Sequence, residues 1–190
     1  MDASEAREHL DMVERIIAAS ARRLEAGGEF FIVWGLIGAA IDALIAGAEA
    51  SAIPLVAFYA AYPALIVAGI AFSVLRVRYY QRCGDRMSFL EREYLNVLWL
   101  TICLATVAMF TMFHIFSSDV AKMSLWSFAE VLVLFYVGMH GNRRAQIGGI
   151  VMLASLVTAN FMSDYAAWIL AAGVFLGYAG FGLADLLARD

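Results

Sequence analysis

The chain has 190 residues, of which 63% are hydrophobic and 16% are charged, and its formal net charge at pH 7 is −4. A soluble domain carries roughly 45–50% apolar and about 25% charged residues, so this chain has more apolar side chain than one globular core can bury. The composition excludes a disordered chain, the excess of acid over base excludes a nucleic-acid-binding protein, and two cysteines exclude a disulfide scaffold. What remains is an all-α polytopic membrane protein.

The first predicted element is an amphipathic helix over residues 2–26, within a cytoplasmic segment 1–28 that precedes a membrane domain, 29–190. Its apolar residues recur at helical spacing opposite a charged face, and it lacks the unbroken apolar core of a signal peptide. The helix lies on lipid, packs on the floor of the bundle, or binds a cytoplasmic protein partner. Seven acids against four arginines in residues 1–29 disfavour anionic lipid. The helical spacing of the apolar residues does not distinguish packing on the bundle from binding of a cytoplasmic partner.

Six apolar segments follow, each near the ~20 residues that a helix needs to cross a hydrocarbon core about 30 Å thick. The fourth and fifth are short and are expected to extend into flanking polar residues, and Pro63 should tilt or kink the second. Short turns join the six helices as three antiparallel hairpins. The predicted spans are 30–48, 53–77, 95–116, 123–139, 147–161 and 166–187.

Basic residues segregate to one side of these spans. Twelve of the 13 Lys and Arg fall in the two termini and the two loops on that side, and only Lys122 falls on the other. Cytoplasmic loops collect Lys and Arg, which predicts that both termini are cytoplasmic. Termini on one side require an even number of spans, so charge and hydropathy agree on six.

Intramembrane polar residues gather in the outer half of the predicted bundle. A charge at mid-membrane costs at least about 2.5–3.5 kcal/mol, so an acid there is a candidate functional residue. At 1.5 Å of rise per residue, Asp42 lies roughly 18 Å from the inner end of its span and Glu130 about 9 Å below the outer surface. The candidates for one outward-facing ion or ligand pocket are Asp42, His114, Glu130, Asn160 and Asp164.

If Asp42, His114 and Glu130 converge, they form an aqueous cavity that holds a cation or relays protons. The alternative is that a nearby side chain satisfies each acid separately. Three tyrosines are available for that, namely Tyr59, Tyr62 and Tyr136. No paired His or Cys spacing supports a zinc site, so neither a metal nor another cofactor is predicted.

Small residues predict close helix packing. Gly173, Gly177 and Gly180 lie at i, i+4 and i+7 on one face of the last span, and Gly35 and Gly38, three residues apart, form a similar face in the first. Such faces let backbones approach closely. The contact lies within one bundle or between the two chains of a homodimer.

The segment from His140 to Arg144 follows the fourth span at its cytoplasmic end. Arg143 and Arg144 offer forked donors to a lipid or nucleotide phosphate, with His140 beside them. The reading that we favour is that the two arginines fix the topology and cap a helix end. Asp185, at the inner end of the last span, is expected to pair with one of them.

The opening of the chain resembles a family of small six-span bacterial membrane proteins of unassigned function. The likeness rests on Phe30-Phe31-Ile32-Val33-Trp34-Gly35 and on an amphipathic helix with Glu5, Leu10, Ile16-Ile17, Arg22 and Leu24. It implies the bacterial plasma membrane. Because members of such families are often encoded beside transcription regulators, it also implies sensing or regulation. It carries no catalytic residue.

The sequence does not predict an enzyme. It contains no nucleophile elbow, metalloprotease motif, phosphate loop or dinucleotide fingerprint, and its three histidines are dispersed. The favoured function is a regulatory, sensory or interaction protein that lies in the lipid bilayer and binds no nucleic acid. The alternative is a small cation- or proton-coupled transporter or channel that uses the acidic pocket.

Overall fold

The computed structural model describes residues 28–82, 119–140 and 142–188, with isolated positions at 12, 96–97, 99–101, 103–104 and 107. All regular secondary structure within these residues is helical, as the sequence predicts. Apart from Met12, the amphipathic segment 2–26 lies outside the described residues, and so does most of the predicted third span, including His114. The predicted hairpin between the third and fourth spans therefore stays a prediction.

The described helices follow the predicted spans closely. The two short spans extend into polar residues, because α5 begins at Asp119 and α6 at Arg143, and α3 continues through Pro63. The last span is one rod that contains a five-residue π turn, η3, which the sequence did not predict. The elements are α2 (Gly28–Glu49), α3 (Leu55–Arg82), α5 (Asp119–Met139), α6 (Arg143–Phe161), η2 (Ser163–Tyr165), α7 (Ala166–Val174), η3 (Phe175–Ala179) and α8 (Gly180–Leu187).

Three described helices are long and apolar enough to cross a membrane: Gly28–Glu49, Val56–Arg82 and Ser163–Leu187. A shorter apolar helix covers Met123–Met139. The outer surface of the bundle is also apolar, with large side chains exposed on every long helix, for example Val67 on α3 at 63% and Ile147 on α6 at 61%. Exposed apolar surface of this extent is typical of helices that face lipid.

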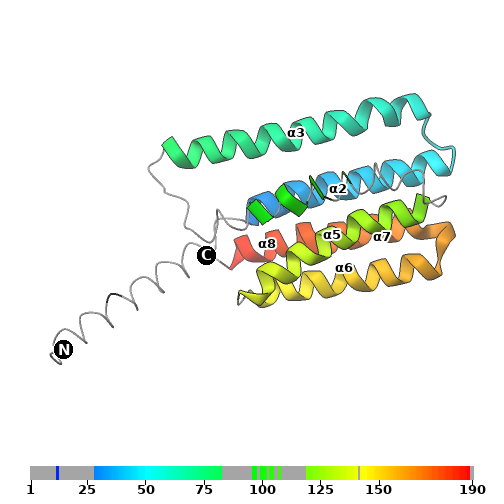
Figure 1. Cartoon of the computed structure of the whole chain (residues 1–190). Coiled ribbons are helices and arrows are strands. Elements are labelled where there is room, and N and C mark those ends of the chain that lie inside the picture. The colour runs from blue at the N-terminus through cyan, green and yellow to red at the C-terminus, as the bar shows by residue number, and fades with distance from the viewer. Residues whose placement is uncertain are drawn as a thin grey trace.

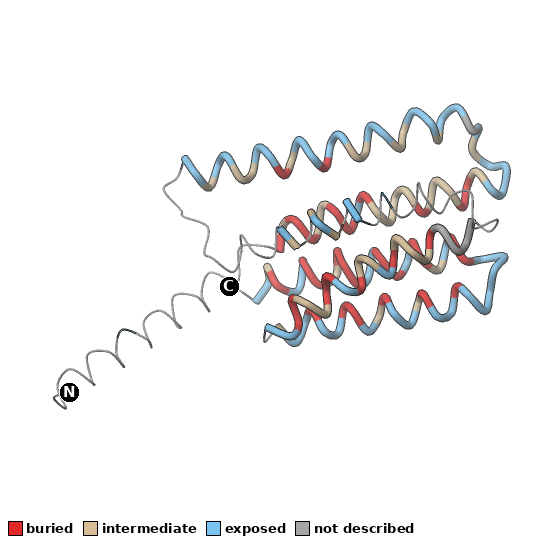
Figure 2. The backbone as a smooth tube through the Cα atoms, viewed as in Figure 1, coloured by how far each residue is buried: buried red, intermediate tan, exposed pale blue. Residues whose placement is uncertain are grey.

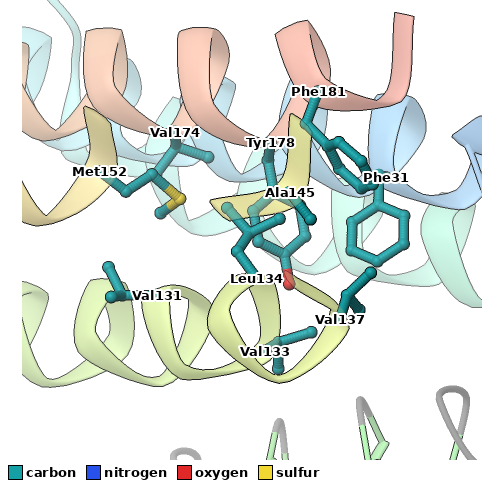
Figure 3. Close-up of a cluster of buried hydrophobic side chains, with 10 residues drawn as sticks. All are labelled: Phe31, Val131, Val133, Leu134, Val137, Ala145, Met152, Val174, Tyr178 and Phe181. Carbon is teal, nitrogen blue, oxygen red and sulfur yellow. The ribbon is translucent and has the colours of Figure 1, made fainter. Parts of the chain in front are cut away.

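Four rods form the packed body, and α3 lies along one side of it (Figure 1). The rod α7–η3–α8 packs against both α2 and α6, and α5 packs against α6. Buried residues gather on the facing sides of these rods, whereas α3 is exposed along most of its length (Figure 2). The largest buried cluster centres on Leu134, Tyr178 and Phe181 (Figure 3). A second cluster lies farther along, around Ala46, Ala159 and Leu170.

Contacts between α2 and α3 concentrate in the half of the pair where α2 begins. Trp34 Nε1 donates to Ser73 Oγ at 3.1 Å, and both residues are buried. Arg76 Nη2 donates to Glu29 Oε1 at 2.6 Å, and the same two side chains form an ion pair. These contacts hold α3 against α2 although little of α3 is buried.

The two ends of the bundle differ in charge. At the Gly28 end, where α2 begins, Gly28 approaches Gly182 and Asn142 hydrogen bonds to Asp185. At the Glu49 end, α2 ends beside the start of α5 and of α7, where Ala46, Met123 and Ala166 pack together. The described arginines all belong to the Gly28 end: Arg76, Arg78, Arg82, Arg143 and Arg144.

Candidate functional site

Asp42 and Glu130 come together inside the bundle. Asp42 lies on the buried stripe of α2, one turn after Gly38, and is 7% exposed. Glu130 lies one turn before Leu134, the most completely buried leucine of α5. The two acids interact electrostatically across the α2–α5 interface. The structure thus joins two of the residues that the sequence singled out.

Gly38 makes room for the Glu130 carboxylate. A Cβ atom on Gly38 would lie 3.3 Å from Glu130 Oε1 and 3.0 Å from Val174 Cγ1, tighter than nearly all real contacts of that kind. Any side chain on Gly38 would therefore press on both neighbours. The predicted packing glycine is also a wall of the acidic site.

Glu130 lies farther from the start of its helix than the sequence indicated. Because α5 begins at Asp119 and not at Met123, Glu130 is eleven residues from the start of its helix, about 16 Å at 1.5 Å per residue. The figure of about 9 Å counted from the apolar part of the helix, so the depth of Glu130 below the outer surface stays a prediction. Asp42 and Glu130 Oε2 are buried in the bundle, and the pocket open to the outside stays a prediction.

Two aromatic side chains complete the site. Trp126, one turn before Glu130 on α5, hydrogen bonds to the Glu130 side chain. Tyr178, from η3, is 2% exposed and interacts electrostatically with Glu130. Glu130 Oε2 and the Tyr178 hydroxyl are both buried, and neither has a hydrogen-bond partner among the described residues. The site therefore has unused hydrogen-bonding capacity on two buried groups.

The electrostatics of this site call for a cation. Two buried carboxylates repel one another, and each loses hydration that it had in water, so their burial is costly without an opposite charge. The ion pair found among the described residues, Arg76 with Glu29, lies at the Gly28 end and not at this site. Within the described part of the chain, no three His, Cys, Asp or Glu side chains cluster as a metal site requires. A proton or a small ion held by two carboxylates fits the arrangement.

Asn160 and Asp164 do not join Asp42 and Glu130. Asn160 donates to Leu156 O at 2.9 Å and to Ser124 Oγ at 3.4 Å, so it closes the last turn of α6. Asp164 is exposed in η2, where the chain turns from α6 to α7. Both residues lie at the Glu49 end, where α6 turns into α7. Polar side chains are expected at such a turn because they can bind backbone groups that the helix leaves unpaired. His114 lies outside the described residues.

Arg143 and Arg144 do not cap a helix end. They form the first turn of α6, where the helix dipole disfavours cations, and both are exposed. Asn142 is the cap, since its side chain accepts from the backbone N–H groups of Arg144 and Ala145. Asn142 also donates to Asp185 Oδ1 at 3.2 Å, and the pairing of Asp185 with an arginine stays a prediction. His140, just before this turn, is exposed and contacts Tyr136.

The glycine faces pack within one bundle. Gly173 approaches Ser155 of α6, Gly177 approaches Met152, and Gly35 approaches Tyr178 and Ala179. Gly180 is the exception, because its nearest neighbour is a carbonyl of its own helix, Phe175 O, at 3.8 Å. The predicted i, i+4, i+7 face was wrong at this position.

The π turn η3 explains that error. The extra residue in the turn rotates the following positions around the helix axis. Phe181 therefore faces α6 where Gly180 was expected, and its Cβ lies 3.3 Å from a Cβ atom built on Gly148. The glycine that packs on α2 is then Gly182, against Gly28 and Ile32.

Sequence reasoning missed Tyr178 and Trp126, both of which interact with Glu130. For Trp126 a signal existed, because residues at i and i+4 of a helix are neighbours. For Tyr178, the signal was a hydroxyl in the middle of an apolar span. The direction in which this side chain points, however, depends on the π turn, which the sequence did not predict. The Glu29–Arg76 pair was also missed, although an antiparallel hairpin brings the start of one helix beside the end of the next.

Comparisons with protein-family models, with curated proteins and with solved structures give no match for this chain. The resemblance to a bacterial six-span family therefore stays a prediction.

Proposed function

We propose that the chain is a six-span membrane protein of a bacterial plasma membrane, with both termini in the cytoplasm. Three helices of membrane-spanning length support this, as do the apolar exterior and the lengths of α5 and α6, 21 and 19 residues. The remaining span, third in chain order, is the segment 95–116. The gathering of the described arginines at the Gly28 end supports the orientation, because positive residues stay in the cytoplasm.

Single cysteines test this topology in a variant whose Cys83 and Cys103 are replaced by serine. Cysteines at Ser51 and Ser163, both at the Glu49 end, should react with a membrane-impermeant maleimide on intact cells. A cysteine at Arg144 should react only after the cells are opened. The reverse pattern would overturn the orientation, and reaction of all three on intact cells would overturn the spans.

We further propose that the protein is a small cation- or proton-coupled transporter whose coupling site is the acidic pair Asp42–Glu130. The observation that carries this is the meeting of two carboxylates from different helices inside an apolar bundle, with Glu130 Oε2 left without a partner. Ionisable residues inside membrane bundles are costly and commonly mark ion or proton pathways. A role confined to packing would be served better by apolar side chains of similar size.

A regulatory role through residues 2–26 stays a prediction, because it depends on a segment of which the structure describes only Met12. No contact among the described residues favours it over transport.

Flux measurements on the purified protein in liposomes test the proposal. Under an imposed proton or cation gradient, Asp42→Asn and Glu130→Gln should each abolish the protein-dependent flux. Glu49→Gln is the matched control, since Glu49 is an exposed acid at the end of the same helix as Asp42. Equal flux in all four proteins would exclude the pair as the coupling site.

A further inference from the structure

The Tyr178 hydroxyl is buried and has no hydrogen-bond partner among the described residues. Figure 3 shows its oxygen pointing from η3 toward α5. The hydroxyl and Glu130 Oε2 are the buried groups without partners at this site, and they belong to side chains that interact electrostatically. Leaving a buried donor and a buried acceptor unpaired is costly for both. Both groups would escape that cost if they paired with one another in another state of the protein.

The surroundings hold the Tyr178 ring in this direction. The Phe31 ring lies with its centroid 5.2 Å from that of Tyr178, and Gly35 lies so close to Tyr178 Cβ that a side chain there would collide with it. Tyr178 also lies within the π turn, and π turns recur at functional sites because they redirect side chains. These contacts fix the direction of the ring, so its hydroxyl stays pointed toward α5.

We propose that the cation bound at this site is a proton shared by Glu130 and Asp42, and that Tyr178 donates its hydroxyl hydrogen to Glu130 Oε2 when that proton leaves. This inference rests on the proposed function and names its coupling ion. The proton passes from the Glu130 carboxyl to water, and Tyr178 keeps its own hydrogen throughout. The bare carboxylate is then held by two donors, the Tyr178 hydroxyl and the Trp126 indole.

The donor set favours a proton over a metal ion. Metal ions such as Mg²⁺ and Ca²⁺ take about six or more oxygen ligands, whereas here Trp126 hydrogen bonds to Glu130 and Tyr178 carries a second, unpaired donor. Charge-assisted bonds of that kind stabilise the anion that proton release leaves behind. Among the described residues, the titratable groups facing the site are Asp42 of α2, Glu130 of α5 and Tyr178 of η3. The neighbouring α6 and α7 bring only uncharged side chains to this level, Met152, Ser155 and Val174.

Infrared spectroscopy of the full chain in detergent tests this. The carbonyl stretch of a protonated buried carboxyl should titrate with pH and should vanish in Glu130→Gln. In Tyr178→Phe the anion loses a donor, so the titration midpoint should move to higher pH by about one unit, a tenfold change in proton release. Tyr165→Phe is the control, because Tyr165 is exposed in η2 and its loss should leave the midpoint unchanged.

The outcomes separate this inference from the proposed function. A titrating band whose midpoint is the same in Tyr178→Phe as in the wild type would overturn the role of Tyr178 and leave the coupling site standing. Tryptophan fluorescence that responds to sodium, potassium or zinc ions in a Glu130-dependent way, with no titrating band, would overturn the proton and again leave the site standing. No Glu130-dependent response to any cation would overturn both. Since Tyr178→Phe removes only an unpaired hydroxyl, it should fold.

Discussion

Gly35 marks the closest approach between α2 and the π turn, and Gly35→Ala should destabilise the protein. A Cβ atom there would lie 2.5 Å from the Ala179 backbone nitrogen and 2.9 Å from Tyr178 Cβ. Ordinary contact begins near 3.4 Å, so the two backbones would have to separate by about 0.9 Å, enough to lose a quarter to half of the dispersion energy of the contacts between them. Overpacking costs about 1–3 kcal/mol, and the better helix propensity of alanine returns about 1 kcal/mol.

We therefore expect Gly35→Ala to lower the free energy of unfolding by up to about 2 kcal/mol. Gly180→Ala is the matched control, because its nearest neighbour is 3.8 Å away and alanine should stabilise it by up to about 1 kcal/mol. Unfolding in mixed micelles of mild and denaturing detergent, followed by tryptophan fluorescence, measures both. Equal stability of the two variants would refute the close approach at Gly35. A loss at Gly180 as large as at Gly35 would mean that the last span is a regular α-helix.

Three further substitutions test contacts of the fold. Ser73→Ala leaves the buried Trp34 N–H without its acceptor and should cost about 1–3 kcal/mol in the same unfolding assay; no loss would mean that α3 is held otherwise. Asn142→Ala removes the cap of α6 and should cost about 1 kcal/mol, which helix content and stability together would report; an unchanged protein would contradict the cap. Glu29→Gln weakens the part-exposed pair with Arg76 and should cost at most about 1 kcal/mol, less at high salt; a larger, salt-independent loss would contradict that reading.

The acidic pair was predictable as two residues but not as one site. Asp42 and Glu130 stand out in the sequence because a carboxylate in an apolar run is costly wherever it lies. Their meeting depends on the rotation of α2 and α5 about their own axes, which Gly38 permits by leaving room for the carboxylate. Asn160 and Asp164 look similar by composition alone. They lie elsewhere because each is at a helix end, where a polar side chain has backbone groups to bind.

The sequence alone predicted the positions of the helices, because its apolar runs match the thickness of a bilayer. The described helices begin or end within a few residues of those runs. That information is local, because the cost of leaving a backbone unpaired in lipid acts on each segment separately. Which faces meet was decided only in the packed bundle. One extra residue in a π turn exchanges Gly180 for Phe181 at an interface, and the contacts of α7–η3–α8 with α2 and α6 determine whether that turn is stable. The direction of Tyr178, and with it the character of the site, follows from that packing.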